Sequence, residues 1–228
     1  MRSSVINSKS VIIIPVYNGR DSVLRLVREI KEIIDCPIMV IDDGSTDGIA
    51  AEDFVDVGYL KHPENRGKGA ALKTGLALAK EAGFDNAITL DADGQHDPHE
   101  IPNFISQIEE HPGSMVVGMR NLVNKAMPFH RQLSNNITSL MLSLRIGRRV
   151  RDSQVGYRCY PLKHSRLWDS IEDGFMFESV VFFNAAKLRI SLAWQPIPVI
   201  YGAEGSHINP MMDTLRFIRM YLQNLIRV

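Results

Sequence analysis

Short runs of branched aliphatic residues alternate with helical patterns through the first half of this chain. The run Val11–Val16 reads VIIIPV and has no charged position, which is typical of a strand buried on both faces of a parallel sheet. The expected strands are Val11–Val16, Pro37–Ile41, Val57–Leu60, Ala87–Leu90 and Met115–Met119. The expected helices are Asp21–Ile34, Lys68–Ala82 and a third that begins at Asp97-Pro98. This alternation predicts an α/β fold with a mostly parallel central sheet flanked by helices.

The second half is less regular and carries two amphipathic patterns. One helical stripe consists of Leu133, Ile137, Leu140, Met141 and Leu144. The other lies in the C-terminal residues 210–228. Strands are expected at Val155–Tyr160 and Ala193–Ile200, with a helix near Phe177–Leu188 between them. Each amphipathic helix either packs on the sheet or lies on a membrane surface, because the hydrophobic pattern alone does not separate these cases.

Acidic and basic residues are equal in number but segregated along the chain. The 26 Asp and Glu balance 26 Lys and Arg, yet residues 42–100 hold 13 of the acids and residues 111–151 hold none. Zero net charge argues against binding of nucleic acid by bulk electrostatics. The segregation leaves two interpretations open: a cation site in one region and an anion site in another, or a chance clustering of charges on a solvated face.

Two further features limit the class of protein. Cys36 and Cys159 are the only cysteines, so the chain has no disulfide framework. The sequence shows no uncharged apolar run of the roughly 18 residues needed for a spanning helix, and its N-terminus lacks the pattern of a signal peptide. We therefore expect a cytoplasmic protein, with the amphipathic helices as its candidate contact with a membrane.

Polar motifs follow four of the expected strands at the point where each ends. They are Pro15-Val16-Tyr17-Asn18, Asp42-Asp43-Gly44-Ser45-Thr46-Asp47-Gly48, Asn65-Arg66-Gly67-Lys68-Gly69-Ala70 and Asp91-Ala92-Asp93-Gly94-Gln95. Ligands of open α/β sheets bind at the carboxyl ends of parallel strands. Four such motifs in order therefore predict one ligand site along that edge.

Asp91-Ala92-Asp93 is the candidate metal motif. In an extended segment, residues i and i+2 point the same way, so both carboxylates can share one hard divalent cation, Mg²⁺ or Mn²⁺. Gln95 can add a neutral oxygen, and such an ion stabilises a departing phosphate. Lys68 and the backbone N–H groups at the start of its helix suit a diphosphate.

Five motifs together resemble those of a known family. PVYN, DDGSTDG, NRGKGAA, DADGQ and DSQVGYR occur in this order and are similar to glycosyltransferase family 2, in particular to its dolichyl-phosphate and polyprenyl-phosphate sugar synthases. The resemblance spans about residues 10–207. It implies a single GT-A (nucleotide-diphospho-sugar transferase) domain over residues 1–209, with a donor half at about 10–119 and an acceptor half at about 120–209. A C-terminal amphipathic helix over residues 210–228 would follow.

The resemblance also implies roles for single residues. The donor site would consist of Pro15, Tyr17, Asn18, Asp42, Asp43, Lys68, Asp91 and His207. Within it, Asp42 and Asp43 would meet the base and ribose, and His207 would touch the diphosphate. The metal ligands would be Asp91, Asp93 and Gln95.

On the acceptor side, the resemblance implies that Gln154 and Arg158 line the sugar and acceptor site. An acceptor phosphate would be held by Arg120, Arg131 and Ser134. Together with Asp91 and Asp93, the four named Arg and Gln side chains are the expected catalytic group. The chain departs from many relatives at Gly19 and Val180, where those relatives have Glu, and both departures bear on donor and acceptor specificity.

The acid-free basic segment favours one acceptor chemistry. A hydroxyl acceptor needs a general base, whereas a phosphate is already an anion at neutral pH and needs cations to hold it. We therefore predict inverting, metal-dependent transfer from a GDP- or UDP-linked sugar to a polyprenyl phosphate, by a protein peripheral to the cytoplasmic membrane face. Three alternatives stay open: a hydroxyl acceptor with Asp173 or Glu178 as base, a nucleotidyltransferase, and a non-catalytic lipid-surface module.

Overall fold

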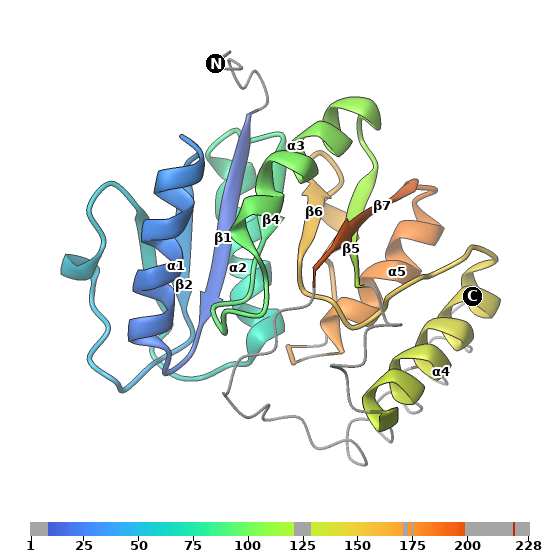
Figure 1. Ribbon diagram of the computed structural model, residues 1–228, viewed down its shortest axis with the longest axis horizontal. Helices are drawn as coiled ribbons and strands as arrows, with labels where there is room; N and C mark the ends of the chain where they lie inside the picture. Colours follow the sequence, from blue (N-terminus) through green and yellow to red (C-terminus); the bar gives the residue numbers. More distant parts are fainter. Residues whose placement is uncertain (1–8, 121–128, 171–172, 175, 199–220, 222–228) are drawn as a thin grey trace.

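The computed structural model describes residues 9–120, 129–170, 173–174, 176–198 and 221, with the backbone alone described at 129–131. Within these residues, seven strands form one sheet in the order β3-β2-β1-β4-β6-β5-β7 (Figure 1). The strands are β1 (Ser10–Val16), β2 (Ile38–Asp42), β3 (Gly58–Lys61), β4 (Asn86–Thr89), β5 (Met115–Arg120), β6 (Arg158–Pro161) and β7 (Leu192–Ile197). Only β6 among them runs against its neighbours, β4 and β5, so the predicted mostly parallel sheet is confirmed.

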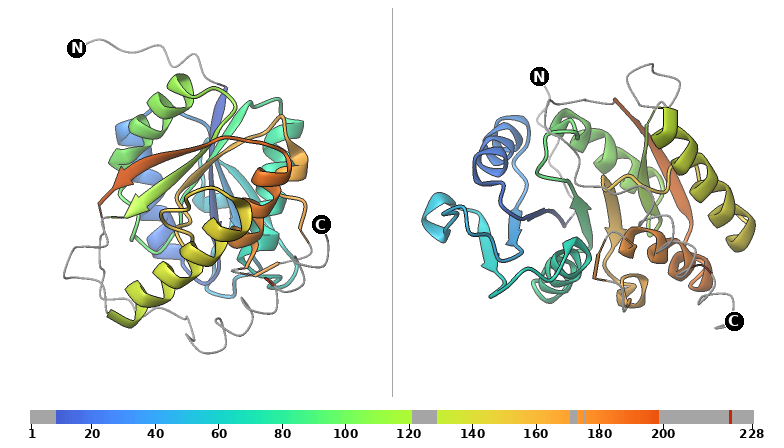
Figure 2. Two further views of the ribbon diagram at one scale, coloured as in Figure 1. Left: turned by 90° about the vertical axis from the view of Figure 1, so that its right-hand side faces the viewer. Right: turned by 90° about the horizontal axis from the view of Figure 1, so that it is seen from below.

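Helices cover both faces of this sheet. The α-helices are α1 (Arg20–Ile33), α2 (Lys68–Glu81), α3 (Ile101–Glu110), α4 (Phe129–Ile146) and α5 (Phe177–Lys187). Single 3₁₀ turns lie at Ala51–Asp53, Pro98–Glu100 and Ser165–Leu167. Figure 2 shows α1 and α3 on one side of the sheet and α2 and α5 on the other. Helix α4 contacts α5 and lies beyond the edge strand β7.

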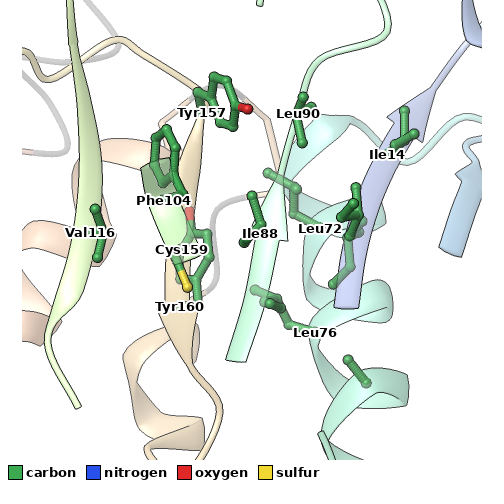
Figure 3. Close-up of a cluster of buried hydrophobic side chains, with 14 of the residues drawn as sticks. Ile14, Leu72, Leu76, Ile88, Leu90, Phe104, Val116, Tyr157, Cys159 and Tyr160 are labelled. Carbon is green, nitrogen blue, oxygen red and sulfur yellow. The ribbon is translucent and has the colours of Figure 1, made fainter. Parts of the chain in front are cut away.

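The core lies at the centre of the sheet, where the strands are apolar on both faces. All seven residues of β1 are buried, as its unbroken aliphatic run predicts. Figure 3 shows Ile14 of β1, Ile88 of β4 and Cys159 of β6 on neighbouring strands, with Leu72 and Leu76 of α2 among them. Burial of this apolar surface stabilises the sheet, and the register of the sheet determines where the strand ends lie.

The carboxyl ends of the parallel strands meet along one edge. The register pairs Val16 with Asp42 at the ends of β1 and β2. Because β6 is antiparallel, its first residue, Arg158, lies at this same edge, opposite Thr89 of β4 and Val117 of β5. The motif that precedes β6 therefore joins the motifs that follow β1, β2 and β4.

The predicted elements agree with the structure to within about two residues at most boundaries. Two predicted strands differ more. The strand predicted at Val155–Tyr160 begins only at Arg158 because residues 155–157 form a buried loop, and the strand predicted at Ala193–Ile200 ends at Ile197, with residues 199 and 200 outside the described ones. The predicted C-terminal helix over 210–228 lies outside the described residues, apart from Tyr221. None of the helices in the described part of the chain is long and apolar enough to cross a bilayer.

Candidate active site

The loops after β1 and β2 are fastened to each other. The backbone N–H of Asn18 donates to Oγ of Ser45 at 2.8 Å, and the backbone N–H of Thr46 donates to Oδ1 of Asn18 at 2.8 Å. Asn18 has a φ of 51°, which asparagine tolerates better than most residues. Beside it, Pro15 is buried and Tyr17 is 50% exposed. The aromatic ring of Tyr17 therefore offers an open flat surface at the sheet edge.

Asp42 ends β2 with a fully buried side chain. Its Oδ1 accepts from the backbone N–H of Ser45 at 2.8 Å, and its Oδ2 accepts from the Tyr59 hydroxyl at 2.8 Å. Burial raises the pKa of Asp42, but the hydrogen bonds from Ser45 and Tyr59 outweigh burial and hold this pKa below its ordinary value. Asp42 is thus an anion that organises its own loop, and its contact with a nucleotide base stays a prediction.

Asp43 connects three further segments. Its carboxylate accepts from Nδ1 of His62 at 2.8 Å and from the backbone N–H groups of Arg66 at 3.1 Å and Gly67 at 2.7 Å. On the other side of the imidazole, Nε2 lies 3.0 Å from Oγ1 of Thr74 on α2. Asp43 therefore positions the loop that leads to Lys68, while its predicted contact with a ribose stays a prediction.

The metal motif lies in a turn and not in an extended segment. Strand β4 ends at Thr89, residues 92 and 93 form a turn, and Oδ1 of Asp93 accepts from the backbone N–H of Gln95 at 3.0 Å. The argument that strand alternation aims Asp91 and Asp93 the same way is therefore wrong. The two carboxylates are nevertheless close enough to interact, since burial and then the charge of Asp91 raise the pKa of Asp93.

The turn fits a hard divalent cation. Two interacting carboxylates repel each other, and a cation between them relieves that repulsion. No group of three or more His, Cys, Asp or Glu side chains within the described ranges can hold a metal by itself. Gln95, water and a ligand phosphate would have to complete the shell of oxygens.

His96 holds the backbone of the metal motif by a hydrogen bond. Its Nδ1 accepts from the backbone N–H of Asp91 at 3.1 Å, and its ring lies 5.1 Å from the ring of Tyr157, which stacks on Phe104 at 4.3 Å. The side chain is 7% exposed, and burial lowers the pKa of His96. A neutral imidazole on an aromatic stack thus fixes the backbone of a candidate metal ligand.

Lys68 joins the phosphate motif to the metal motif. Its Nζ lies 2.6 Å from Oδ1 of Asp91 and 2.8 Å from Oε1 of Glu178 on α5. Gly156 makes room for this contact, since a Cβ there would lie 2.6 Å from Oδ2 of Asp91 and 2.8 Å from Nζ of Lys68. The glycine of DSQVGYR is therefore a packing requirement of the ion pairs.

Arg158 lies beneath the site and not in its lining. Its side chain is fully buried, and its guanidinium donates to the backbone carbonyls of Val155, Glu178 and Ser153 at 2.8, 2.7 and 2.9 Å. The guanidinium also lies 4.8 Å from the ring centre of Phe182. The structure thus corrects the implied position of Arg158, whose hydrogen bonds tie the site loop to α5.

The structure describes some of the remaining predicted acceptor residues and not others. Arg120 ends β5 and makes a two-pronged ion pair with buried Asp152, at 2.7 and 2.8 Å. Gln154 is exposed two residues further on, and Ser134 is part-buried on α4. The side chain of Arg131 and all of His207 lie outside the described residues.

Helix α4 presents four of the five residues of its apolar stripe outward and its polar face inward, while the fifth, Met141, packs partly against the core. Leu133, Ile137, Leu140 and Leu144 are 48%, 50%, 60% and 74% exposed. The buried face carries Asn135, Thr138 and Ser139, together with Leu142. Oγ of Ser139 donates to Oγ of Ser153 at 3.0 Å, and that hydroxyl donates to Oδ1 of Asn135 at 3.3 Å. This orientation is the reverse of what burial in a core requires.

A groove of about 1080 Å³ runs beside α4. Leu140 and Leu144 of α4 and Ile197 of β7 contribute apolar surface, while Arg120 and Arg149 contribute positive charge. The groove therefore combines apolar and cationic walls next to the predicted acceptor residues.

Sequence reasoning missed three supporting side chains. These are His62, His96 and Asp152. His96 directly follows DADGQ and Asp152 opens DSQVGYR, so their places in motifs were available signals, whereas nothing in the sequence marks His62. Each becomes visible only when the fold shows which backbone group or charge it faces.

Comparison with known proteins gives a family and several relatives. The sequence model of a family described as "Glycosyl transferase family 2" matches residues 11–166. A UDP-N-acetylglucosamine–dolichyl-phosphate N-acetylglucosaminyltransferase from Methanococcus voltae is 31% identical over 214 residues, which cover 83% of this chain and 85% of that protein. An undecaprenyl-phosphate mannosyltransferase from Micrococcus luteus is 28% identical over 202 residues, covering 82% of each chain.

Solved structures share the fold at lower identity. Mannosyl-3-phosphoglycerate synthase from Rubrobacter xylanophilus matches with a TM-score of 0.74 and 17% identity, over 96% of this chain and 75% of that one. Glucosyl-3-phosphoglycerate synthase from Mycobacterium tuberculosis, crystallised with Mn²⁺, UDP and glucosyl-3-phosphoglycerate, matches with a TM-score of 0.70 and 16% identity, over 100% and 85%. At this identity the match concerns the fold, and it confirms the predicted architecture.

Proposed function

The chain belongs to glycosyl transferase family 2, and on that premise we propose that it transfers a sugar, with inversion, from a nucleotide diphosphate to a polyprenyl phosphate. Membership of the family makes the chain a glycosyltransferase, so the nucleotidyltransferase and the non-catalytic module are no longer alternatives. Relatives named for dolichyl-phosphate and undecaprenyl-phosphate acceptors support the lipid acceptor.

The orientation of α4 is the observation that carries the choice of acceptor. A soluble acceptor gives no reason for leucines at 60% and 74% exposure beside a groove that arginines line. A polyprenyl phosphate has an apolar chain and an anionic head, which match these two surfaces. The proposal therefore places α4 at a membrane surface, with the acceptor entering from residues 120–209 and the donor held by residues 10–119.

On the donor side, the loops at the strand ends divide the work. Tyr17 and the loop that Asp42 organises would take the base and ribose, while Lys68 and the start of α2 would face the diphosphate. Asp91, Asp93 and Gln95 would hold Mg²⁺ or Mn²⁺, which neutralises charge on the leaving diphosphate. Structural neighbours that bind Mn²⁺ and UDP support this assignment.

On the acceptor side, a phosphate needs positioning cations and no general base. The two carboxylates considered as bases for a hydroxyl acceptor both face lysines: Nζ of Lys68 lies 2.8 Å from Glu178, and Lys73 pairs with Asp173. Arg131 and Ser134 on α4 and Arg120 on β5 are the proposed phosphate contacts. A base-dependent reaction with a sugar hydroxyl is the second candidate.

An acceptor trial tests the proposal. The protein is incubated with Mn²⁺ and labelled UDP- or GDP-sugars, together with either a C55 polyprenyl phosphate in detergent or soluble monosaccharides and glycerol phosphates. We expect label in the organic phase only with the polyprenyl phosphate, with release of the nucleoside diphosphate and an inverted anomeric signal by NMR. Label transferred only to soluble acceptors would reject the lipid acceptor and leave family membership intact.

A further inference from the structure

Lys68 occupies the position of a cation between two carboxylates from distant parts of the chain. Asp91 follows β4 and Glu178 lies on α5, yet their oxygens lie 2.6 and 2.8 Å from the same ammonium nitrogen. The side chains of Lys68, Asp91 and Glu178 are 18%, 23% and 7% exposed, so water screens this cluster little. One positive charge here compensates two negative ones.

The surroundings hold the ammonium in this place. Gly67 and Gly69 let the loop at Asp173 approach the start of α2, because a Cβ at either would lie within 3.0 Å of the backbone of Asp173. Asp43 anchors the N–H of Gly67 at 2.7 Å from the other side. These contacts fix the backbone at the start of α2, and so they fix the point from which the Lys68 side chain reaches Asp91.

Asp91 thus has two cations competing for it. It is a proposed ligand of the divalent ion and is also the partner of Lys68. A divalent ion bound at the Asp91–Asp93 turn would repel the ammonium next to it, and the repulsion is strong where water is scarce. This repulsion weakens the contact of Lys68 with Asp91, the binding of the ion, or both.

We propose that Lys68 is an internal counter-ion of Asp91, which yields Asp91 to the divalent cation and turns to the diphosphate of the donor. This inference rests on the proposed function, because it takes the metal and the diphosphate from it. Glu178 keeps one contact with the ammonium and so limits how far Lys68 moves. Metal and nucleotide then increase each other's binding affinity. The metal displaces the ammonium of Lys68 from Asp91, and the diphosphate pairs with the displaced ammonium. Such coupling is reciprocal for the two binding constants.

Direct binding of Mn²⁺ tests this without any turnover. Free Mn²⁺ is measured by electron paramagnetic resonance in titrations of wild type, Lys68→Met, Lys68→Arg and Lys73→Met, each with and without saturating UDP or GDP. Lys73 is the matched control, because it lies on the same helix and pairs with Asp173 instead of Asp91. Lys68→Met alone leaves the buried carboxylate of Glu178 without its cation, which can destabilise the fold. The double variant Lys68→Met with Glu178→Gln removes both charges and therefore controls for this instability.

Without nucleotide, we expect Lys68→Met and the double variant to bind Mn²⁺ about tenfold more tightly than wild type, and Lys68→Arg and Lys73→Met to match wild type. UDP or GDP should tighten Mn²⁺ binding in every protein, because its phosphates complete the metal's shell, but about tenfold more in wild type and Lys73→Met than in Lys68→Met.

Equal Mn²⁺ affinity of wild type and both Lys68→Met proteins would overturn the counter-ion role while leaving the metal site standing. Absence of Mn²⁺ binding to wild type, even with nucleotide present, would overturn this inference together with the metal dependence in the proposed function.

Discussion

At the end of β2, the carboxylates of Asp42 and Asp43 are buried and each meets several donors, whereas α4 turns serines and an asparagine inward and leucines outward. The first region is ordered by hydrogen bonds to the charged groups, as at Asp43, which accepts from His62, Arg66 and Gly67. The second is held by hydroxyl contacts such as Ser139 to Ser153. The difference teaches that both regions depart from the usual rule of an apolar interior and a polar surface, each in its own way. A water-soluble donor and a lipid acceptor would require this contrast.

The largest effect is expected at the metal turn. Asp93→Asn removes a proposed metal ligand, and transfer should fall about a thousandfold because the leaving diphosphate loses its counter-charge. Sugar transfer measured with labelled donor checks this. Asp97→Asn in the same loop is the control, since Asn preserves the helix cap that Asp97 provides to His99. Equal loss in both variants would mean that the loop, and not the metal ligand, controls activity.

A test of the inward-facing region follows. Asp43→Ala leaves His62 and two backbone N–H groups without their acceptor, and the free energy of unfolding should fall by about 3 kcal/mol. Urea denaturation followed by circular dichroism measures it. Asp47→Ala, at an exposed residue that accepts the backbone N–H of Arg20 at 2.8 Å and that of Ile49 at 3.4 Å, should cost less than about 1 kcal/mol. A stable Asp43→Ala protein would remove the contrast between the two regions.

A smaller effect is expected at His96. His96→Leu removes the acceptor for the backbone N–H of Asp91 and should weaken Mn²⁺ binding about tenfold, whereas His96→Asn retains an acceptor and should recover part of the affinity. Titration of Mn²⁺ by calorimetry in the presence of UDP gives both numbers. His99→Leu, at a histidine whose side chain is 75% exposed, is the control. Wild-type affinity in His96→Leu would show that the turn keeps its shape without the imidazole.

The smallest effect on stability is expected on α4. Leu140→Gln with Leu144→Gln alters exposed residues and should change the free energy of unfolding by less than about 0.5 kcal/mol. Sedimentation with phosphatidylglycerol vesicles should nevertheless show several-fold weaker binding, because apolar surface is lost from the membrane face. The fully buried Leu142 supplies the opposite control, since Leu142→Gln should destabilise the fold by about 3 kcal/mol. Vesicle binding unchanged by the double variant would reject α4 as the contact.

Most of the sheet could be predicted because its central strands are long aliphatic runs that only a buried strand accommodates, as Val11–Val16 shows. The sequence wrongly predicts that residues 155–157 belong to a strand, for a related reason. Val155 and Tyr157 are apolar and buried, so they look like strand residues, but they are buried in a loop that packs under the site. Burial and strand pairing are separate consequences of tertiary structure, and local sequence does not distinguish them.

The site was predictable in outline because parallel strands end at one edge, whatever their order. Side-chain direction was not. Asp91 and Asp93 lie past the end of β4, where strand alternation no longer applies. The family resemblance implies that Arg158 lines the ligand site, and only the fold shows the three carbonyls that hold it beneath that site. The stripe on α4 reads the same whether it faces the core or solvent, so its outward direction had to come from the structure.

The reversed direction of β6 has a consequence for how this architecture can diversify. Strand β5 leaves the sheet at the edge where β6 enters it, and Val117 faces Arg158 across the pair. The intervening segment, with α4, is therefore an excursion whose two ends lie side by side. Such a segment can lengthen, shorten or be exchanged without changing the path of any strand, because the distance it must span stays the same. The α4 part of this segment is thus a replaceable module, whereas the loop with Gly156 packs against Lys68 and Asp91 and has to stay with the donor site.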